Sequence, residues 1–142
     1  MELHRCINYL LNAAQNTVFQ QLKAKLAPFS ITPAQYGVLN CLWNHSSFTP
    51  KQIGDMLRLE ASSVSSILDR MQKNGLIDRY IDLDDRRSIQ VVATQKGKDL
   101  QSSVELVIEQ VNEEFFSLIN DVEISQEALM KSLLIIADAQ LD

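Results

Sequence analysis

Several residue types and patterns are scarce in this 142-residue chain, and each scarcity excludes a class of protein. Two cysteines, Cys6 and Cys41, are too few for a disulfide framework, so we expect reduced and mostly buried thiols. The apolar runs are far shorter than a bilayer span, and the first residues lack the pattern of a secretory signal. We therefore expect a cytoplasmic protein that is not stabilised by disulfides and does not span a membrane.

Motifs for catalysis and metal binding are scarce as well. The chain has two histidines, and it has neither a glycine-rich phosphate loop nor a nucleophile elbow. Cys41 and His45 are four residues apart, which suits two ligands of one ion, but no CxxC or HxxxH pattern accompanies them. The sequence therefore predicts a protein that is not an enzyme and holds no cofactor and no metal.

Positive charge is in deficit overall, with a formal net charge of -5, but it is unevenly distributed. Residues 50–98 hold nine of the 13 basic residues against seven acids, whereas the flanking segments hold four bases and eleven acids. Because nucleic-acid binding usually leaves a basic footprint, we expect contact with phosphate only through the middle of the chain.

Helical patterns dominate the first part of the chain. Residues 3–26 place apolar side chains at helical spacing and predict one long helix. Segments 32–35 and 49–52 both read Thr-Pro-x-Gln, in which threonine caps a helix, proline takes its first position and glutamine its third. The first of these helices is expected to run to about Asn44. The second is short and is expected to bury Ile53, Met56 and Leu57.

The middle of the chain combines another helix with a hairpin. From about Ser62 an apolar face (Val64, Ile67, Leu68, Met71) alternates with a polar one, and Asn74-Gly75 predicts a left-handed end. Residues 77–81 and 89–93 are strand-like and are joined by a charged tip without glycine or proline. Ser46 to Thr49 is a connector with room for one short strand.

Two further helices are expected after the hairpin. Thr94 caps a long one that runs to about Ile119, with inward residues that include Leu118, and Ser125 opens the last. The apolar faces of residues 100–119 and 126–136 are too large to be buried on a sixty-residue unit, so they predict a twofold dimer. The alternative is that they thicken one monomeric core.

The order of four helices followed by a hairpin is that of a winged helix-turn-helix. The fold class is then mainly α with a small β-hairpin wing (α+β), flanked by long N- and C-terminal dimerisation helices. Small hydroxyls and cations on the fourth helix suit the major groove, and arginines at the hairpin tip suit the minor groove. Asp84 and Asp85 are expected to orient those arginines by bidentate pairing. The candidate DNA-binding residues are Ser62, Ser63, Ser65, Ser66, Arg70, Lys73, Asp85, Arg86 and Arg87.

Four segments together resemble the MarR family of transcription regulators: the Ile-Thr-Pro-Ala-Gln-Tyr of residues 31–36, the pattern within residues 64–79, the Asp-Arg-Arg-Ser of 85–88 and the Ala-Thr-Gln-Lys-Gly of 93–97. The resemblance implies a homodimer held by its terminal helices on a pseudo-palindromic operator in double-stranded DNA. It predicts a helical dimerisation region in residues 1–30 and 98–142, and a DNA-binding region in residues 31–97, as one intertwined domain. Asp85 and Arg87 fall on the family's Asp-x-Arg wing signature.

Regulation has more than one reading. Family resemblance implies a repressor that is released by a small, often aromatic or phenolic, effector bound between dimerisation helices and winged helix. The candidate pocket residues are Tyr9, Phe19, Tyr36, Trp43 and Arg58. The alternative is that they are ordinary core aromatics at helical spacing.

A thiol switch at Cys6 is an alternative, because Arg5 or His4 would supply the positive charge that activates a thiolate. Aligned without gaps, however, the family's peroxide-sensing cysteine falls near Asn8. A further alternative is a winged-helix dimer that acts as a ligand-binding or protein-interaction module without binding DNA.

Overall fold

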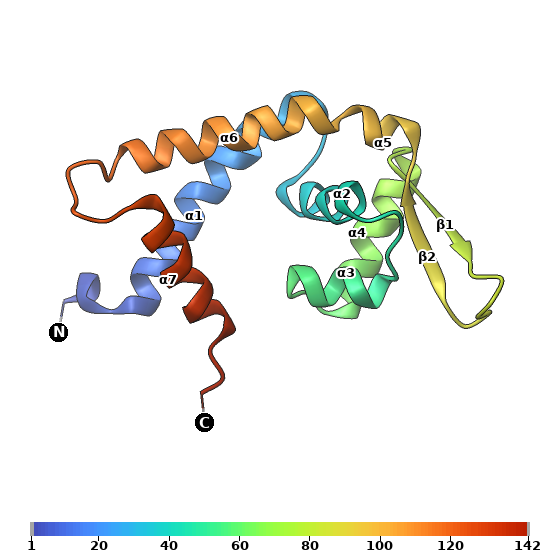
Figure 1. Cartoon of the computed structure of the whole chain (residues 1–142), viewed down its shortest axis with the longest axis horizontal. Helices are drawn as coiled ribbons and strands as arrows, with labels where there is room; N and C mark the ends of the chain where they lie inside the picture. The colour runs from blue at the N-terminus through green and yellow to red at the C-terminus, as the bar shows by residue number, and fades with distance from the viewer. Residues whose placement is uncertain (1, 142) are drawn as a thin grey trace. The chain divides into compact units, whose positions relative to one another are not determined.

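The computed structural model describes residues 2–141, which form helices and one two-stranded antiparallel sheet (Figure 1). This confirms the predicted class, mainly α with one hairpin. In chain order the elements are η1 (Leu3–Arg5), α1 (Ile7–Leu26), η2 (Ala27–Phe29), α2 (Pro33–Asn44), α3 (Pro50–Leu57), α4 (Ala61–Lys73), β1 (Ile77–Ile81), β2 (Ile89–Ala93), α5 (Gln95–Asp99), α6 (Gln101–Ser117) and α7 (Gln126–Asp138).

The chain divides into two compact units, one that ends at Val107 and one that begins at Ile108. The first unit holds η1 to α5 and the start of α6, and the second holds the rest of α6 and α7. The division falls inside one helix, so the expected boundaries at residues 30/31 and 97/98 stay predictions. Within the described residues, no helix combines the length and apolarity needed to cross a bilayer.

Both predicted capping boxes are present and fix where α2 and α3 begin. The Gln35 amide donates to Thr32 Oγ1 at 3.2 Å, and the Thr32 amide donates to Gln35 Oε1 at 3.1 Å. In α3 the same exchange joins Gln52 and Thr49 at 3.1 and 2.9 Å. Each box provides side-chain acceptors for two backbone N–H groups that a bare helix start would leave without partners.

The core of the first unit lies between α2, α3, α4 and the inner side of the hairpin. Its largest fully buried side chains are Leu26, Val38, Leu39, Ile53, Val64, Leu68, Met71, Ile77, Val91 and Val104. Strands β1 and β2 cover the predicted ranges and pair antiparallel, from Ile77 opposite Ala93 to Ile81 opposite Ile89. Ser46 to Thr49 is a connector, as expected, and Phe48 within it forms a single antiparallel bridge to Val91, so no full strand is present there.

The helices differ from the predictions at two breaks. The expected first helix is divided at Cys6 into η1 and α1, and the expected helix after Thr94 is divided at Leu100 into α5 and α6. Both breaks are short, and Leu100 keeps near-helical angles (φ -74, ψ -20). The apolar periodicity therefore continues through the break at Leu100 and gives no sign of it, whereas Cys6 has an extended backbone (φ -91, ψ 114).

Two side chains expected to be inward are exposed. Met56 is 58% exposed next to the end of α3 at Leu57, whereas Ile53 is buried as expected and Gly54 is buried as well. Leu118 is 75% exposed because α6 ends at Ser117, so helical spacing no longer applies to it.

Candidate nucleic-acid interface

Helix α4 presents a polar surface along its whole length. Its buried side is formed by Val64, Leu68 and Met71, as the sequence predicts. The six candidate residues on the helix are all exposed: Ser62, Ser63, Ser65, Ser66, Arg70 and Lys73. We call Ser62, Ser63, Ser65 and Ser66 the serine face. The helix thus brings four hydroxyls to its N-terminal turns and two cations to its last turn.

The start and end of α4 follow from local chemistry. Its N-cap is Glu60, whose side chain forms no capping hydrogen bond, so the first backbone amides are open to another acceptor. Such amides, with the positive end of the helix dipole, favour phosphate oxygens. The helix ends at Lys73 with Asn74 as its C-cap, and Gly75 then takes the predicted left-handed conformation (φ 72).

Gly54 allows α3 and α4 to cross closely. A Cβ at this position would lie 3.3 Å from Val64 Cγ2 and 3.0 Å from the Leu59 carbonyl oxygen. The Leu59 amide donates to the Gly54 carbonyl at 2.9 Å, after Arg58 has taken a left-handed conformation (φ 57). The tight turn holds α4 at a fixed angle to α3, which is how a helix-turn-helix presents its second helix.

Residues 82–88, the wing tip, are organised by two aspartates. The Asp82 carboxylate accepts the Asp84 amide at 2.9 Å, and the Asp85 carboxylate accepts the Arg87 amide at 3.0 Å. The Ser88 amide donates to the Asp85 carbonyl at 2.9 Å and closes the turn. These side-chain turns replace the glycine and proline that the tip lacks.

The expected pairing of Asp84 and Asp85 with the arginine guanidinia is wrong. Across residues 2–141, neither carboxylate forms an ion pair with Arg86 or Arg87, because Asp85 is turned toward the Arg87 backbone amide. Asp85, Arg86 and Arg87 are exposed. The two arginines are therefore exposed on a tip whose backbone is folded by these turns.

The sequence did not reveal one contact of this surface, in which a side chain of the hairpin forms hydrogen bonds with α4. On β1, Arg79 donates from Nε to Gln72 Oε1 and from Nη2 to Asp69 Oδ1, each at 2.7 Å. Asp69 and Gln72 lie one helical turn apart, so one guanidinium reaches both. We call these three residues the clamp. Its signal was an arginine two positions after buried Ile77, on the inward side of the strand.

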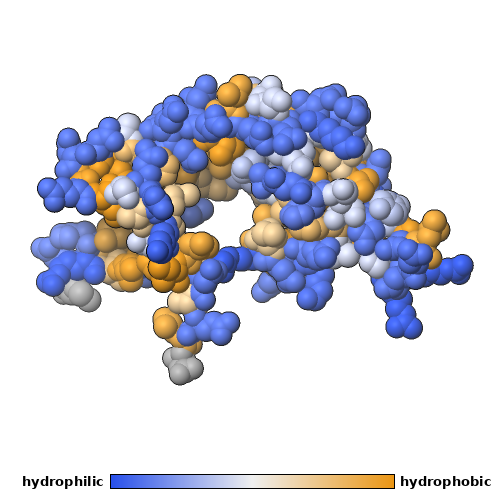
Figure 2. Space-filling view, viewed as in Figure 1, coloured by the Kyte–Doolittle hydropathy of each residue, from blue (hydrophilic) through white to orange (hydrophobic). Residues whose placement is uncertain are grey.

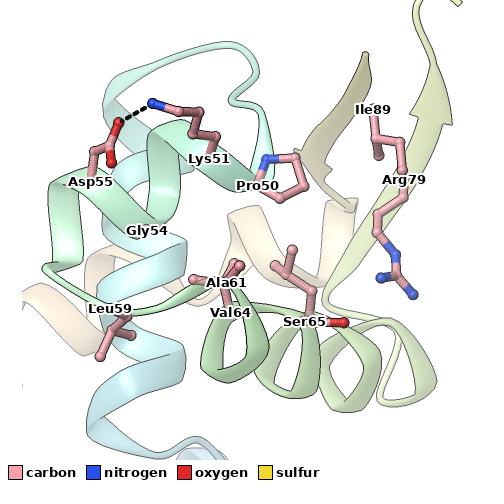
Figure 3. A pocket seen from close by; sticks show the side chains of 11 residues that line it. Pro50, Lys51, Gly54, Asp55, Leu59, Ala61, Val64, Ser65, Arg79 and Ile89 are labelled. Carbon is pink, nitrogen blue, oxygen red and sulfur yellow. Dashed lines mark hydrogen bonds and ion pairs between the residues drawn. The ribbon is translucent and has the colours of Figure 1, made fainter. Parts of the chain in front are cut away.

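A cavity of about 550 Å³ lies between α3, α4 and the hairpin (Figure 3). Ser65 and Leu68 of α4 line it together with Arg79 and Ile89 of the hairpin and residues of α3. Figure 3 shows the Arg79 side chain descending from its strand toward α4. The hairpin is therefore separated from α3 by open space on this side.

The five candidate effector residues do not line this cavity. Tyr36 and Trp43 are neighbours on α2, with ring centroids 6.3 Å apart, and Trp43 donates from Nε1 to the Gly97 carbonyl at 3.0 Å. Burial, and then the negative charge of Glu105, raise the pKa of the Tyr36 phenol. Tyr9 and Phe19 are partly exposed on α1, and Arg58 ends α3. Their assignment to an effector pocket stays a prediction.

The two cysteines occupy different environments. Cys41 is buried, and burial raises the pKa of its thiol, more than a backbone hydrogen bond lowers it. Cys6 is half-buried at the N-cap of α1. His45 is exposed and stacks on Phe48, with ring centroids 4.4 Å apart. In the part of the chain that the structure describes, no three potential metal-ligating side chains gather.

Comparison with known proteins agrees with this architecture. A family model described as MarR family matches residues 31–89. The organic hydroperoxide resistance transcriptional regulator of Bacillus subtilis (strain 168) is 34% identical over 97 residues. That match covers 68% of this chain and 66% of the regulator, about two thirds of each.

Two solved structures show the same fold over nearly the whole chain. The transcriptional repressor CouR, bound to a 23-mer DNA duplex, has a TM-score of 0.85 and 28% identity, covering 96% of this chain and 95% of that one. BpsR of Bordetella bronchiseptica, whose DNA binding is regulated by 6-hydroxynicotinic acid, has a TM-score of 0.86 and 19% identity, covering 99% of both. The chain belongs to the MarR family of winged helix-turn-helix transcriptional regulators.

Proposed function

We propose that the chain is a homodimeric transcriptional repressor that binds a pseudo-palindromic operator and is released by a small-molecule effector. The observation that carries the proposal is the pairing, in one unit, of an exposed serine face on α4 with a wing tip that extends two arginines. In this arrangement the serine face, Arg70 and Lys73 enter the major groove, and Arg86 and Arg87 follow the adjacent minor groove. Asp85 acts through the backbone by holding the tip turn.

Exposed apolar side chains support the dimer. They gather on the first turns of α1 and along α7, which Figure 2 shows as orange surface. They include Leu3 on η1, Ile7 and Leu10 on α1, and Met130, Leu133, Leu134, Ile135 and Ile136 on α7. A second copy would remove this surface from water and would set two copies of α4 about 34 Å apart, one turn of DNA. Two copies also compensate for a reading surface of low net charge.

A small-molecule effector is supported by one relative and by the way in which an effector can release the protein from its operator. The BpsR structure describes regulation of DNA binding by 6-hydroxynicotinic acid, a small aromatic acid. An effector acts only if it binds more tightly to the spacing of the α4 helices that does not fit the operator. In this proposal the protein works in the cytoplasm without catalysis, since occupancy of the operator blocks transcription.

The test is selection of bound duplexes from a random DNA pool, followed by affinity measurements on the recovered site over a range of salt. Arg87→Ala is expected to weaken binding about tenfold and to reduce the salt slope by about one, since one cation leaves the minor groove. Lys23→Ala removes a cation from α1 and is the matched control, with an unchanged slope.

Two results would contradict the repressor. The first is a pool that shows no enrichment, which would favour a ligand-binding or protein-interaction module instead. The second is an equal change in slope for Arg87→Ala and Lys23→Ala, which would mean that the wing makes no particular contact.

A thiol switch at Cys6 is a second candidate, favoured by its partial exposure at the start of a 20-residue helix and by the hydroperoxide regulator among the relatives. In this candidate the Cys6 sulfur attacks the outer oxygen of an organic hydroperoxide. The O–O bond breaks, the sulfur becomes a sulfenic acid, and the alkoxide that leaves takes a proton to become the alcohol.

Peroxide release of the operator, measured in Cys6→Ser and Cys41→Ser, decides between the switch and the effector. The switch predicts that Cys6→Ser stays bound in peroxide while Cys41→Ser is released like the parent protein. Release of Cys6→Ser by peroxide would eliminate Cys6 as the sensor.

A further inference from the structure

The clamp lies where apolar packing of the hairpin against α4 ends. Along the inner side of β1, Ile77 is fully buried, Arg79 is 29% exposed at its side chain, and Ile81 is 62% exposed. Beyond Ile77, the strand contacts α4 through polar bonds to Asp69 and Gln72. The outward half of the hairpin therefore depends on this guanidinium for its attachment to the helix.

A second attachment lies at the same level on the other strand. Arg79 is opposite Val91 in the hairpin register, and Val91 exchanges two backbone hydrogen bonds with Phe48, at 2.8 and 3.1 Å. The row from Phe48 through Val91 and Arg79 to α4 thus crosses the hairpin from edge to edge. Tyr80 to Gln90 extend past this row.

Arg79 has open space on both sides, so the clamp is the main connection between hairpin and helix at this level. Arg79 lines the cavity of about 550 Å³ toward α3, and it also lines a second one of about 320 Å³ with Asp69, Gln72 and Lys73. Because few atoms fill these spaces, van der Waals packing does little to fix the angle between hairpin and helix. Directional charge-assisted bonds to a planar guanidinium fix such an angle well.

We propose that Arg79 is a positioning residue that sets the wing at a fixed angle to α4, so that the serine face and Arg87 engage DNA together. The inference rests on the proposed function for its consequence but not for its geometry. The guanidinium also neutralises Asp69, a carboxylate on the DNA-facing helix that would otherwise repel phosphate. Arg79 reaches Asp69 and Gln72 and does not itself read DNA.

The first experiment needs no DNA. Amide hydrogen exchange is measured at Asp82, whose amide donates to the Ser88 carbonyl, and at Ser88, whose amide donates to the Asp85 carbonyl. In Arg79→Met both wing-tip amides are expected to exchange about fivefold faster, the effect of losing a half-exposed charge-assisted pair. The Tyr36 amide at the start of α2 is the internal reference and should keep its rate.

Matched variants separate the clamp from general loss of charge or fold. Lys51→Met removes the cation of an exposed ion pair with Asp55 (3.3 Å) on α3 and should leave the tip amides unchanged. Gln72→Met keeps Arg79 and the ion pair, and it should give a smaller acceleration. If Arg79→Met fails to fold, Gln72→Met together with Asp69→Asn replaces it. Unchanged tip exchange in a folded clamp variant would overturn the proposal.

The second experiment is a double-mutant cycle on the selected operator. In the parent protein Arg87→Ala is expected to weaken binding about tenfold, and in the Arg79→Met background less than about threefold, because a released wing already loses that contact. In the Lys51→Met background, Arg87→Ala should again weaken binding by the full factor of about ten. Equal effects in all three backgrounds would refute coupling of wing and helix. If the parent protein binds no duplex, the proposed function fails while the exchange experiment still decides the clamp.

Discussion

Single residues in this chain are constrained mainly where backbones approach closely. Gly97 is the third residue of α5 and lies against the backbone of Leu76, just before β1, and its carbonyl accepts the Trp43 indole N–H at 3.0 Å. The pattern Ala-Thr-Gln-Lys-Gly indicated a helix cap at Thr94, which the structure confirms through the Gly97 amide at 3.2 Å. The close approach was not predictable, because it involves Leu76, which is distant in sequence.

We expect Gly97→Ala to destabilise the protein strongly, because its Cβ would overlap the Leu76 carbonyl oxygen, a backbone atom that cannot turn aside. Overpacking of this kind costs about 1–3 kcal/mol or more in the free energy of unfolding. Gly37→Ala is the control, since its Cβ would meet the flexible end of Leu57 at 3.0 Å. Urea denaturation of both variants is the measurement, and equal stability would contradict the account.

The Tyr36 phenol predicts how stability depends on alkaline pH. Its pKa is raised above 10.0 by burial and by Glu105, whereas in the unfolded chain it titrates near its ordinary value. Its contribution is therefore complete below pH 10 and is lost as the pH rises through the folded-state pKa. We expect Tyr36→Phe to lose less stability between neutral and strongly alkaline pH than the parent protein. An identical alkaline loss in the two proteins would exclude this role.

At the scale of elements, local signals predicted most boundaries and tertiary contacts decided the rest. The two Thr-Pro-x-Gln boxes and the alternation in 77–81 and 89–93 act within a few residues, so α2, α3 and both strands begin where expected. Met56 shows the limit, because its exposure depends on where α3 ends. The candidate DNA-binding residues could be proposed from the sequence, and the structure leaves them exposed. The clamp could not be proposed, because it joins Asp69 to Arg79 across two elements.

The Thr49 box predicts a measurable cost for α3. Thr49→Ala removes the acceptor of the Gln52 amide and should lower the free energy of unfolding by about 1 kcal/mol. Thr17→Ala is the comparison, because Thr17 lies inside α1 and its hydroxyl donates to the Ala13 carbonyl, a bond that the helix does not need. Thermal unfolding distinguishes them, and a Thr17→Ala loss as large as that of Thr49→Ala would argue against capping.

At the scale of the whole molecule, acidic flanks and apolar helix faces occur together. Leu134 and Ile135 on α7 are 58% and 62% exposed, which is unusual for aliphatic side chains in a helix so rich in them. No sequence signal indicates where a second copy contacts this surface, because pairing between chains depends on shape as well as on apolarity.

Leu134→Glu is expected to dissociate the proposed dimer and to abolish operator binding, because a charge at an apolar interface remains without a partner. Gln126→Glu adds the same charge in the exposed first turn of α7, where a carboxylate suits the helix dipole, and should stay dimeric. Light scattering of both variants gives the mass. A Leu134→Glu protein with the mass of the dimer would show that α7 does not form the contact.

The wing tip has a consequence for the entropy of binding. Residues 82–88 lie beyond the row at Val91 and are held by turns of their own. Ordering backbone on DNA costs about 1–2 kcal/mol per residue in entropy, so any freedom that the tip keeps in solution opposes association. The two aspartate turns reduce that freedom before DNA arrives. Calorimetry of an Asp85→Ala protein should therefore show a less favourable binding entropy at nearly unchanged enthalpy.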